Sequence, residues 1–230
     1  MSLATPRISD IQTSDLLYYD PSHKDKCYGF CQKRNIDCLP SMMDDSIYYH
    51  RQENSQCFLE TEITSDIRID GNWPIFHNQI LSKFQNSHLL FVFTFDQLTG
   101  VLHFADYGKD VVSLYLYHLL FAYERNLRQL LAAKGEKDPK QKAGQPPFQT
   151  WYLKKLLTYL YDKHQIDLSQ DINQLRNQIM HAHQLIDQQN YDADDYIYKF
   201  SSFETFFNRV QALLKDMKRV NTLLKIEEPT

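Results

Sequence analysis

The stretch Asp110–Ala133, DVVSLYLYHLLFAYERNLRQLLAA, decides the fold class of the second half of the chain. Its apolar residues recur every three or four positions, which is the period of one face of an α-helix. Gly135 follows the last of them, and glycine there is a typical helix stop. The stretch therefore predicts a long amphipathic helix over residues 110–133. The residues of the apolar face are Tyr115, Leu116, Leu119, Leu120, Tyr123, Leu127, Leu130 and Leu131.

Three more helices are expected after this one. Residues 134–148 hold two glycines and three prolines, so they are predicted to form a loop. A second helix is expected over residues 149–163. A third is expected over 167–187, with Asp167 and Gln170 as its capping box. An acidic turn with Asp192, Asp194 and Asp195 then leads to a fourth helix, predicted from the capping box of Ser201 and Glu204 and the apolar stripe that ends at Leu224.

The third predicted helix carries RNQIMH, residues 176–181, the segment with the clearest chemistry. A histidine such as His181 titrates near neutral pH and can move a proton at a ribose hydroxyl. Arg176 keeps its charge, and its planar fork suits a pentavalent phosphate. Asn177 is four residues before His181 and shares its helix face. These residues predict a site that cuts RNA without a metal, although about 140° of helix separates Arg176 from His181.

The R-x4-H spacing, the polar residue after the arginine and the place of the motif on the third of four helices resemble the HEPN domains. The resemblance covers residues 108–230 and implies an all-α bundle of four antiparallel helices, with Arg176, Asn177 and His181 as catalytic residues. It also implies a symmetric homodimer, because a single R-x4-H motif leaves a site half built, with the 167–187 helix in the interface. No cofactor is required, and RNA is the implied partner.

Two structural alternatives stay open at this point. Arg176 and His181 could be surface residues of an ordinary helical bundle. Glu124, halfway along the first helix, could face the motif across the bundle, but the charged residues around it favour a solvated face.

The first half of the chain contains an internal repeat of helix, strand, turn and strand. In one copy a helix ending at Asn35 precedes strands at 36–42 and 47–49, with a turn at 44–46. In the other, residues 79–84 form the helix, 89–93 and 101–104 the strands, and 96–100 the turn.

This repeat resembles a degenerate tandem CBS pair over residues 1–107, made of two β-α-β-β-α units, so the chain is expected to be an α+β protein. LTGVLHFAD, residues 98–106, resembles the nucleotide signature of that family. The resemblance implies that His103 and Asp106 bind an adenine nucleotide as a regulatory ligand. His103, however, replaces the usual hydroxyl residue, and the first copy has no matching aspartate. Asp106 could equally be the N-cap or first-turn acid of the following helix.

Charge separates the two halves of the chain. Residues 1–106 have 8 Lys and Arg against 14 Asp and Glu, whereas residues 107–230 have 17 against 15. Residues 125–163 carry a net charge of +6, which is what a weak RNA footprint needs, although lysines in a loop are more often only solvated.

Four cysteines, Cys27, Cys31, Cys38 and Cys57, lie in the first half, without the spacing of a zinc site. Reduced thiols, the lack of a long apolar run and the lack of a signal-peptide pattern predict a cytoplasmic protein with no metal site and no membrane span. The leading prediction is RNA cleavage controlled by the CBS pair. The alternative is a non-enzymatic nucleotide sensor or partner-binding protein that dimerises through its helices.

Overall fold

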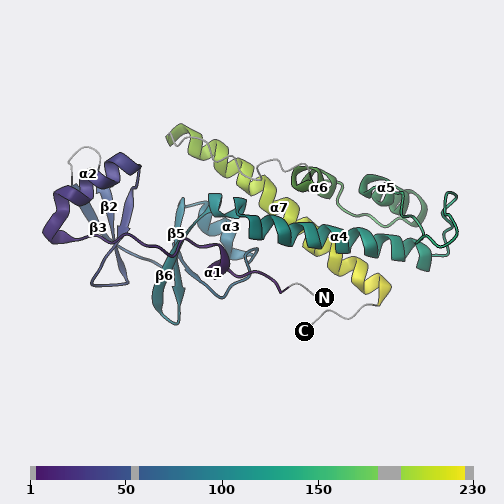
Figure 1. Ribbon diagram of the computed structural model, residues 1–230, viewed down its shortest axis with the longest axis horizontal. Coiled ribbons are helices and arrows are strands. Elements are labelled where there is room, and N and C mark those ends of the chain that lie inside the picture. The colour runs from purple at the N-terminus through teal and green to yellow at the C-terminus, as the bar shows by residue number, and fades with distance from the viewer. Residues whose placement is uncertain (1–3, 53–56, 181–192, 226–230) are drawn as a thin grey trace. The chain divides into compact units, whose positions relative to one another are not determined.

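Two units make up the chain, Thr5–Tyr107 and Gly108–Thr230, the second together with residues 1–4. A computed structural model describes residues 4–52, 57–180 and 193–225, without the side chains of 193–199. The chain is a mixed α+β protein, with sheets in the first unit and long helices in the second (Figure 1).

Two three-stranded sheets form the framework of the first unit. The first sheet has the order β1-β2-β3 and is antiparallel throughout. In the second, β4 is parallel to β5 and β5 is antiparallel to β6. The elements of this unit are α1 Ile8–Ile11, η1 Pro21–His23, α2 Lys24–Arg34, β1 Cys38–Pro40, β2 Ile47–Gln52, β3 Cys57–Glu62, β4 Arg68–Asp70, α3 Gln79–Phe84, β5 Leu89–Thr94, β6 Gln97–His103 and η2 Phe104–Gly108.

The predicted order of helix, strand, turn and strand is confirmed in both copies, as α2-β1-β2 and α3-β5-β6. The first helix ends where it was expected, because Asn35 adopts the left-handed conformation (φ 54°) that closes a helix. The copies share one further feature: a segment before the helix pairs in parallel with the segment after it. In the first copy this is a single bridge from Tyr19 to Ser41, and in the second it is the β4–β5 ladder.

The predicted turn at 96–100 is wrong, because the turn is the two-residue pair Phe95 and Asp96. Both have positive φ angles, 51° and 62°, as a tight hairpin turn requires. Gly100 lies inside β6, where the segment after α1 crosses the strand. Thr13 exchanges both backbone hydrogen bonds with Val101, at 2.8 and 3.0 Å. Gly100 therefore serves a close backbone approach, a role that a sequence pattern does not distinguish from a turn.

The sheets of this unit share an apolar core. Ile63, Phe91, Phe93 and Leu98 are buried together, and the ring of Tyr48 from β2 lies 4.9 Å from that of Phe91 in β5. The backbone N–H of Leu98 donates to the Asp45 carboxylate at 3.1 Å, which joins the two repeats at a polar point as well.

The described residues of the second unit form four helices, and α4 contacts each of the other three (Figure 1). The helix predicted over 110–133 is confirmed as α4, and seven of its eight predicted core residues are buried. The apolar stripe predicted from Phe203 onward lies on α7, where Phe203, Phe206 and Phe207 are buried. The helices are α4 Asp110–Ala133, α5 Leu153–His164, α6 Ile172–Met180 and α7 Ala193–Leu224.

Two predicted helix starts are too early. α5 begins at Leu153, not at residue 149, because Phe148 has a positive φ of 60° and the Trp151 N–H turns back to the Phe148 carbonyl. α6 begins at Ile172, so the proposed capping box of Asp167 and Gln170 is wrong. The intervening segment packs as a loop, with Ile166 and Leu168 buried.

The start predicted for the fourth helix is too late. α7 begins at Ala193, so Ser201 is inside the helix and its carbonyl accepts the Thr205 hydroxyl at 2.9 Å. Asp194 and Asp195, assigned to a turn, instead occupy the first turn of α7.

The expected antiparallel arrangement of the four helices is wrong for α4 and α7. Tyr123 of α4 donates a hydrogen bond to Asp216 of α7, and Asn126 donates one to Asn221. Residue numbers rise together along both helices, so α4 and α7 run in the same general direction (Figure 1). This direction follows from the lengths of the helices. α5 and α6 have 12 and 9 residues, so end to end they span about 32 Å, against about 36 Å for the 24 residues of α4. The two short helices together return the chain along α4.

Candidate functional site

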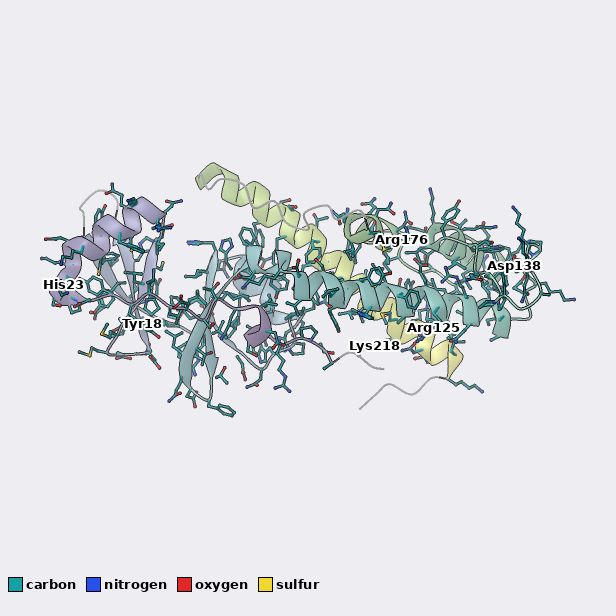
Figure 2. All side chains as sticks on the ribbon, viewed as in Figure 1. Tyr18, His23, Arg125, Asp138, Arg176 and Lys218 are labelled. Carbon is teal, nitrogen blue, oxygen red and sulfur yellow. The ribbon has the colours of Figure 1, made fainter. Side chains whose placement is uncertain are left out.

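Arg176 lies at the edge of the buried face of α6. Ile172 and Leu175 are fully buried and Ile179 is half-buried, so these three residues define the side of the helix that packs inward. Arg176 follows Leu175 directly and is half-buried. The Arg176 side chain, labelled in Figure 2, is 27% exposed and therefore partly accessible to solvent.

Glu124 of α4 binds Arg176 and is the centre of the site. Its Oε1 accepts a hydrogen bond from Arg176 Nε at 2.9 Å, and its Oε2 accepts one from Arg128 Nη2 at 2.9 Å. The Glu124 side chain is 16% exposed. The expectation that Glu124 lies on a solvated face is therefore wrong, and the alternative that it faces the motif across the bundle is confirmed.

The contact with Glu124 leaves most of the Arg176 fork available. Only Nε of Arg176 has a hydrogen-bond partner within the described part of the chain, and the side chain is 27% exposed. An arginine carries five N–H donors in a fixed plane, so four remain on the two terminal nitrogens. Glu124 fixes the plane of the guanidinium, and none of the described residues accepts a hydrogen bond from those four donors.

The structure describes one of the other two motif residues, Asn177, but not His181. Asn177 is exposed on α6 and lies about 100° around the helix from Arg176. His181 lies outside the described residues. The structure therefore places Arg176 and Asn177 on one helix next to Glu124.

A buried carboxylate next to this site holds the segment that leads into α6. Asp216 Oδ2 accepts the Ser169 backbone N–H at 2.7 Å and the Tyr123 hydroxyl at 3.4 Å. Burial raises the pKa of Asp216 above its ordinary value, and burial also raises the pKa of Tyr123. Tyr123 and Glu124 are consecutive in α4, so neighbouring residues fix α7 and α6 in turn.

His103 and Asp106, the predicted nucleotide ligands, form a reciprocal cap at the start of η2. The Asp106 carboxylate accepts the His103 backbone N–H at 2.7 Å, and Nδ1 of His103 accepts the Ala105 backbone N–H at 3.0 Å. Asp106 is thus a first-turn acid, although of η2 and not of the long helix that follows. A bound ribose would have to compete with this cap.

A second polar cluster was not predicted from the sequence. Glu136 Oε2 accepts the Tyr159 hydroxyl at 2.6 Å, and its Oε1 lies 3.0 Å from Nε2 of His164 without a directed hydrogen bond. The hydrogen bond to Glu136 raises the pKa of Tyr159. Glu136 is 23 residues from Tyr159, a separation at which no helical or strand periodicity applies.

Neither a family model, nor a curated protein, nor a solved structure matches the chain. Over the described ranges, no cluster of three His, Cys, Asp or Glu side chains could hold a metal ion. In the same part of the chain, none of the helices is both long and apolar enough to cross a membrane.

Proposed function

We propose that the helical unit is a metal-independent endoribonuclease of the HEPN type and that the N-terminal unit is a CBS-type pair that regulates it. The observation that carries the proposal is the Glu124–Arg176 contact. It orients an arginine whose two terminal nitrogens, among the residues that the structure describes, have no hydrogen-bond partner and could take a phosphate.

In the proposed reaction, Arg176 binds the non-bridging oxygens of the scissile phosphate with its terminal nitrogens and stabilises the charge of the pentavalent state. His181 takes the proton of the ribose 2′-hydroxyl, and the resulting oxygen attacks the adjacent phosphorus. The bond from phosphorus to the 5′-oxygen breaks, and that oxygen takes a proton from solvent water. The products are a 2′,3′-cyclic phosphate and a 5′-hydroxyl. Asn177 orients the ribose 2′-hydroxyl and phosphate group that react.

The decisive experiment is an RNA cleavage assay in EDTA with the wild type, Arg176→Ala and His181→Ala. Acid-base catalysis by a positioned side chain contributes about 10²- to 10⁴-fold, so His181→Ala is expected to abolish detectable cleavage. Arg176→Lys keeps the charge but loses the fork, and is also expected to be nearly inactive.

Arg125→Ala is the matched control. Arg125 is an exposed arginine on α4, next in sequence to Glu124 (Figure 2), so this variant removes the same charge without touching the site. It should cleave RNA like the wild type. Cleavage that survives His181→Ala would contradict the mechanism, and a wild type that cuts no RNA would contradict the nuclease proposal.

The second candidate is a non-enzymatic partner-binding protein that associates through its helices. One feature of α4 favours it: Leu114, Tyr117 and Phe121 are exposed and recur at helical spacing on one face. An exposed apolar stripe of this kind is typical of an association surface. An inactive wild type whose dimer dissociates on Phe121→Glu would favour this candidate.

A further inference from the structure

Lysines gather at one end of the helical unit, around the loop 134–148 and the adjoining helix α5. Residues 134–163 hold seven lysines against three acidic residues. We name five of these lysines the lysine surface: Lys134, Lys137, Lys140 and Lys142 of the loop, and Lys163 at the end of α5. All five are exposed. Within the described part of the chain, none of them has an ion-pair partner.

The acidic residues of the loop do not neutralise the lysine surface, because they point inward and hold the loop. Asp138 is buried, and its two oxygens accept the backbone N–H groups of Lys140 at 3.0 Å and Phe148 at 2.8 Å. Glu136 is engaged by Tyr159 and His164 of α5. The outward charge of the loop is therefore more positive than its composition indicates.

The loop is also anchored to the candidate site through Arg128. Arg128 Nε donates to the Phe148 carbonyl at 3.1 Å, and its Nη2 donates both to the Trp151 carbonyl and to Glu124, at 2.9 Å each. Phe148 itself is fully buried. The same arginine thus fixes the end of the loop and the carboxylate that orients Arg176, so the lysine surface and the site belong to one bonded network.

An exposed aromatic side chain lies beside the lysines. Tyr152, the N-cap of α5, is 60% exposed. Successive residues turn by about 100° around a helix, so Tyr152 and Lys163 lie within about 20° of each other around α5. Tyr159 lies on the same side of α5, and its hydroxyl contacts Glu136 of the loop. Lys154 and Tyr161 lie on the opposite flank of the helix. The loop and this flank of α5 therefore present positive charge and a ring together.

We propose that the lysine surface binds the phosphate backbone of single-stranded RNA, with Tyr152 stacking on an unpaired base, and leads the strand to Arg176. This inference rests on the proposed nuclease function and adds where the substrate binds. Lysines supply charge without sequence preference, and a ring can stack only on a base that is not paired. An acidic peptide or an anionic membrane would also use the lysines but offers no base on which the ring can stack.

The test measures binding of a fluorescein-labelled 2′-O-methyl oligouridine, which lacks the 2′-hydroxyl and cannot be cut, by fluorescence anisotropy. Each phosphate contact contributes about 0.7 to the slope of log affinity against log salt for single strands. Lys137→Gln/Lys140→Gln/Lys142→Gln is expected to reduce that slope by about 2 and to weaken binding by about tenfold or more at low salt. Tyr152→Ala is expected to weaken binding by about fivefold or more at every salt concentration.

The control variant is Lys24→Gln/Lys26→Gln/Lys33→Gln, which removes the same charge from exposed lysines of α2. It should bind like the wild type. Equal weakening by the control, or an unchanged affinity in the loop variant, would overturn the proposal. So would polyglutamate or phosphatidylserine vesicles that bind the loop lysines as tightly as the RNA does, or a Tyr152→Ala variant with wild-type affinity.

Binding and cleavage fail separately in this design. A wild type that binds the uncleavable strand but does not cut RNA would remove the nuclease function and leave the lysine surface supported as an RNA-binding site. A loop variant that binds and cuts like the wild type would remove the lysine surface and leave the nuclease function supported.

Discussion

At the scale of single residues, α4 uses two consecutive side chains to hold two other helices. Tyr123 reaches Asp216 of α7, and Glu124 reaches Arg176 of α6. Consecutive residues diverge by about 100° around a helix, so the two side chains leave α4 in different directions. The Glu124 carboxylate faces two guanidinium groups, so the cluster carries excess positive charge at a half-buried position. Such an excess suits a phosphate.

Glu124→Gln tests this arrangement. The amide cannot pair with both arginines as a carboxylate does, so two guanidinium groups lose their counter-charge. We expect the free energy of unfolding to fall by about 1 to 3 kcal/mol, the cost of losing hydrogen bonds to a charged group. Urea denaturation measures it, with Arg125→Ala as the variant that should change little. Wild-type stability in Glu124→Gln would mean that the cluster contributes nothing to the fold.

Asp216 gives a prediction about pH. Because burial raises its pKa, the folded protein holds the Asp216 proton more tightly than the unfolded chain does. Stability from this group is therefore present at acid pH and lost as the pH rises above about 4. Asp216→Asn keeps an oxygen for Ser169 and Tyr123 without the charge. We expect it to match the wild type near pH 4 and to be more stable at pH 7, measured as unfolding free energies. A variant that is less stable at neutral pH would contradict this account.

At the scale of elements, the sequence predicts best where one face is buried along a whole helix. α4 is such a case, because Leu116, Leu120 and Leu127 repeat without interruption and a glycine follows the helix. α5 and α6 were predicted with wrong starts because distant partners decide those starts. Arg128 takes the carbonyls of Phe148 and Trp151 before α5, and Asp216 takes the Ser169 N–H before α6. The local sequence around each helix start does not indicate that Arg128 or Asp216 binds there.

Two glycines of the first unit should respond in opposite ways to the same substitution. In Gly100→Ala the new Cβ would lie 2.6 Å from Gln12 Cδ and 2.9 Å from the Thr13 carbonyl oxygen, so backbone must shift. We expect the free energy of unfolding of Gly100→Ala to fall by about 1 to 3 kcal/mol. In Gly29→Ala, within α2, the Cβ meets nothing within 4 Å, and the helix should gain about 0.5 to 1 kcal/mol. Thermal unfolding of the two variants should show a lower melting temperature for Gly100→Ala and a higher one for Gly29→Ala. A neutral Gly100→Ala would show that the close approach is not needed.

At the scale of the whole molecule, the sequence predicted the α+β class, both repeats and the helical second half, because these depend on local periodicity. It predicted Arg176 and Asn177 from their motif but left the contact with Glu124 as one of two alternatives, because Glu124 and Arg176 are 52 residues apart. The pairing is visible in the sequence only as a glutamate four residues before Arg128. That spacing favours an i,i+4 ion pair but says nothing about α6. Asp106 shows the converse limit, since its pattern matched a nucleotide ligand and the structure gives it a capping role as well.

A symmetric homodimer is the expectation at this scale, because one R-x4-H motif per chain supplies only half of a composite site. Light scattering should give twice the chain mass of 27.3 kDa. Mixing inactive Arg176→Ala subunits with inactive His181→Ala subunits tests the composite site directly. If arginine and histidine come from different subunits, each mixed dimer regains one complete site, and random pairing restores about a quarter of the wild-type cleavage rate. Activity that stays at zero in confirmed mixed dimers would place both residues of a site in the same chain, and a monomer in light scattering would exclude the shared site altogether.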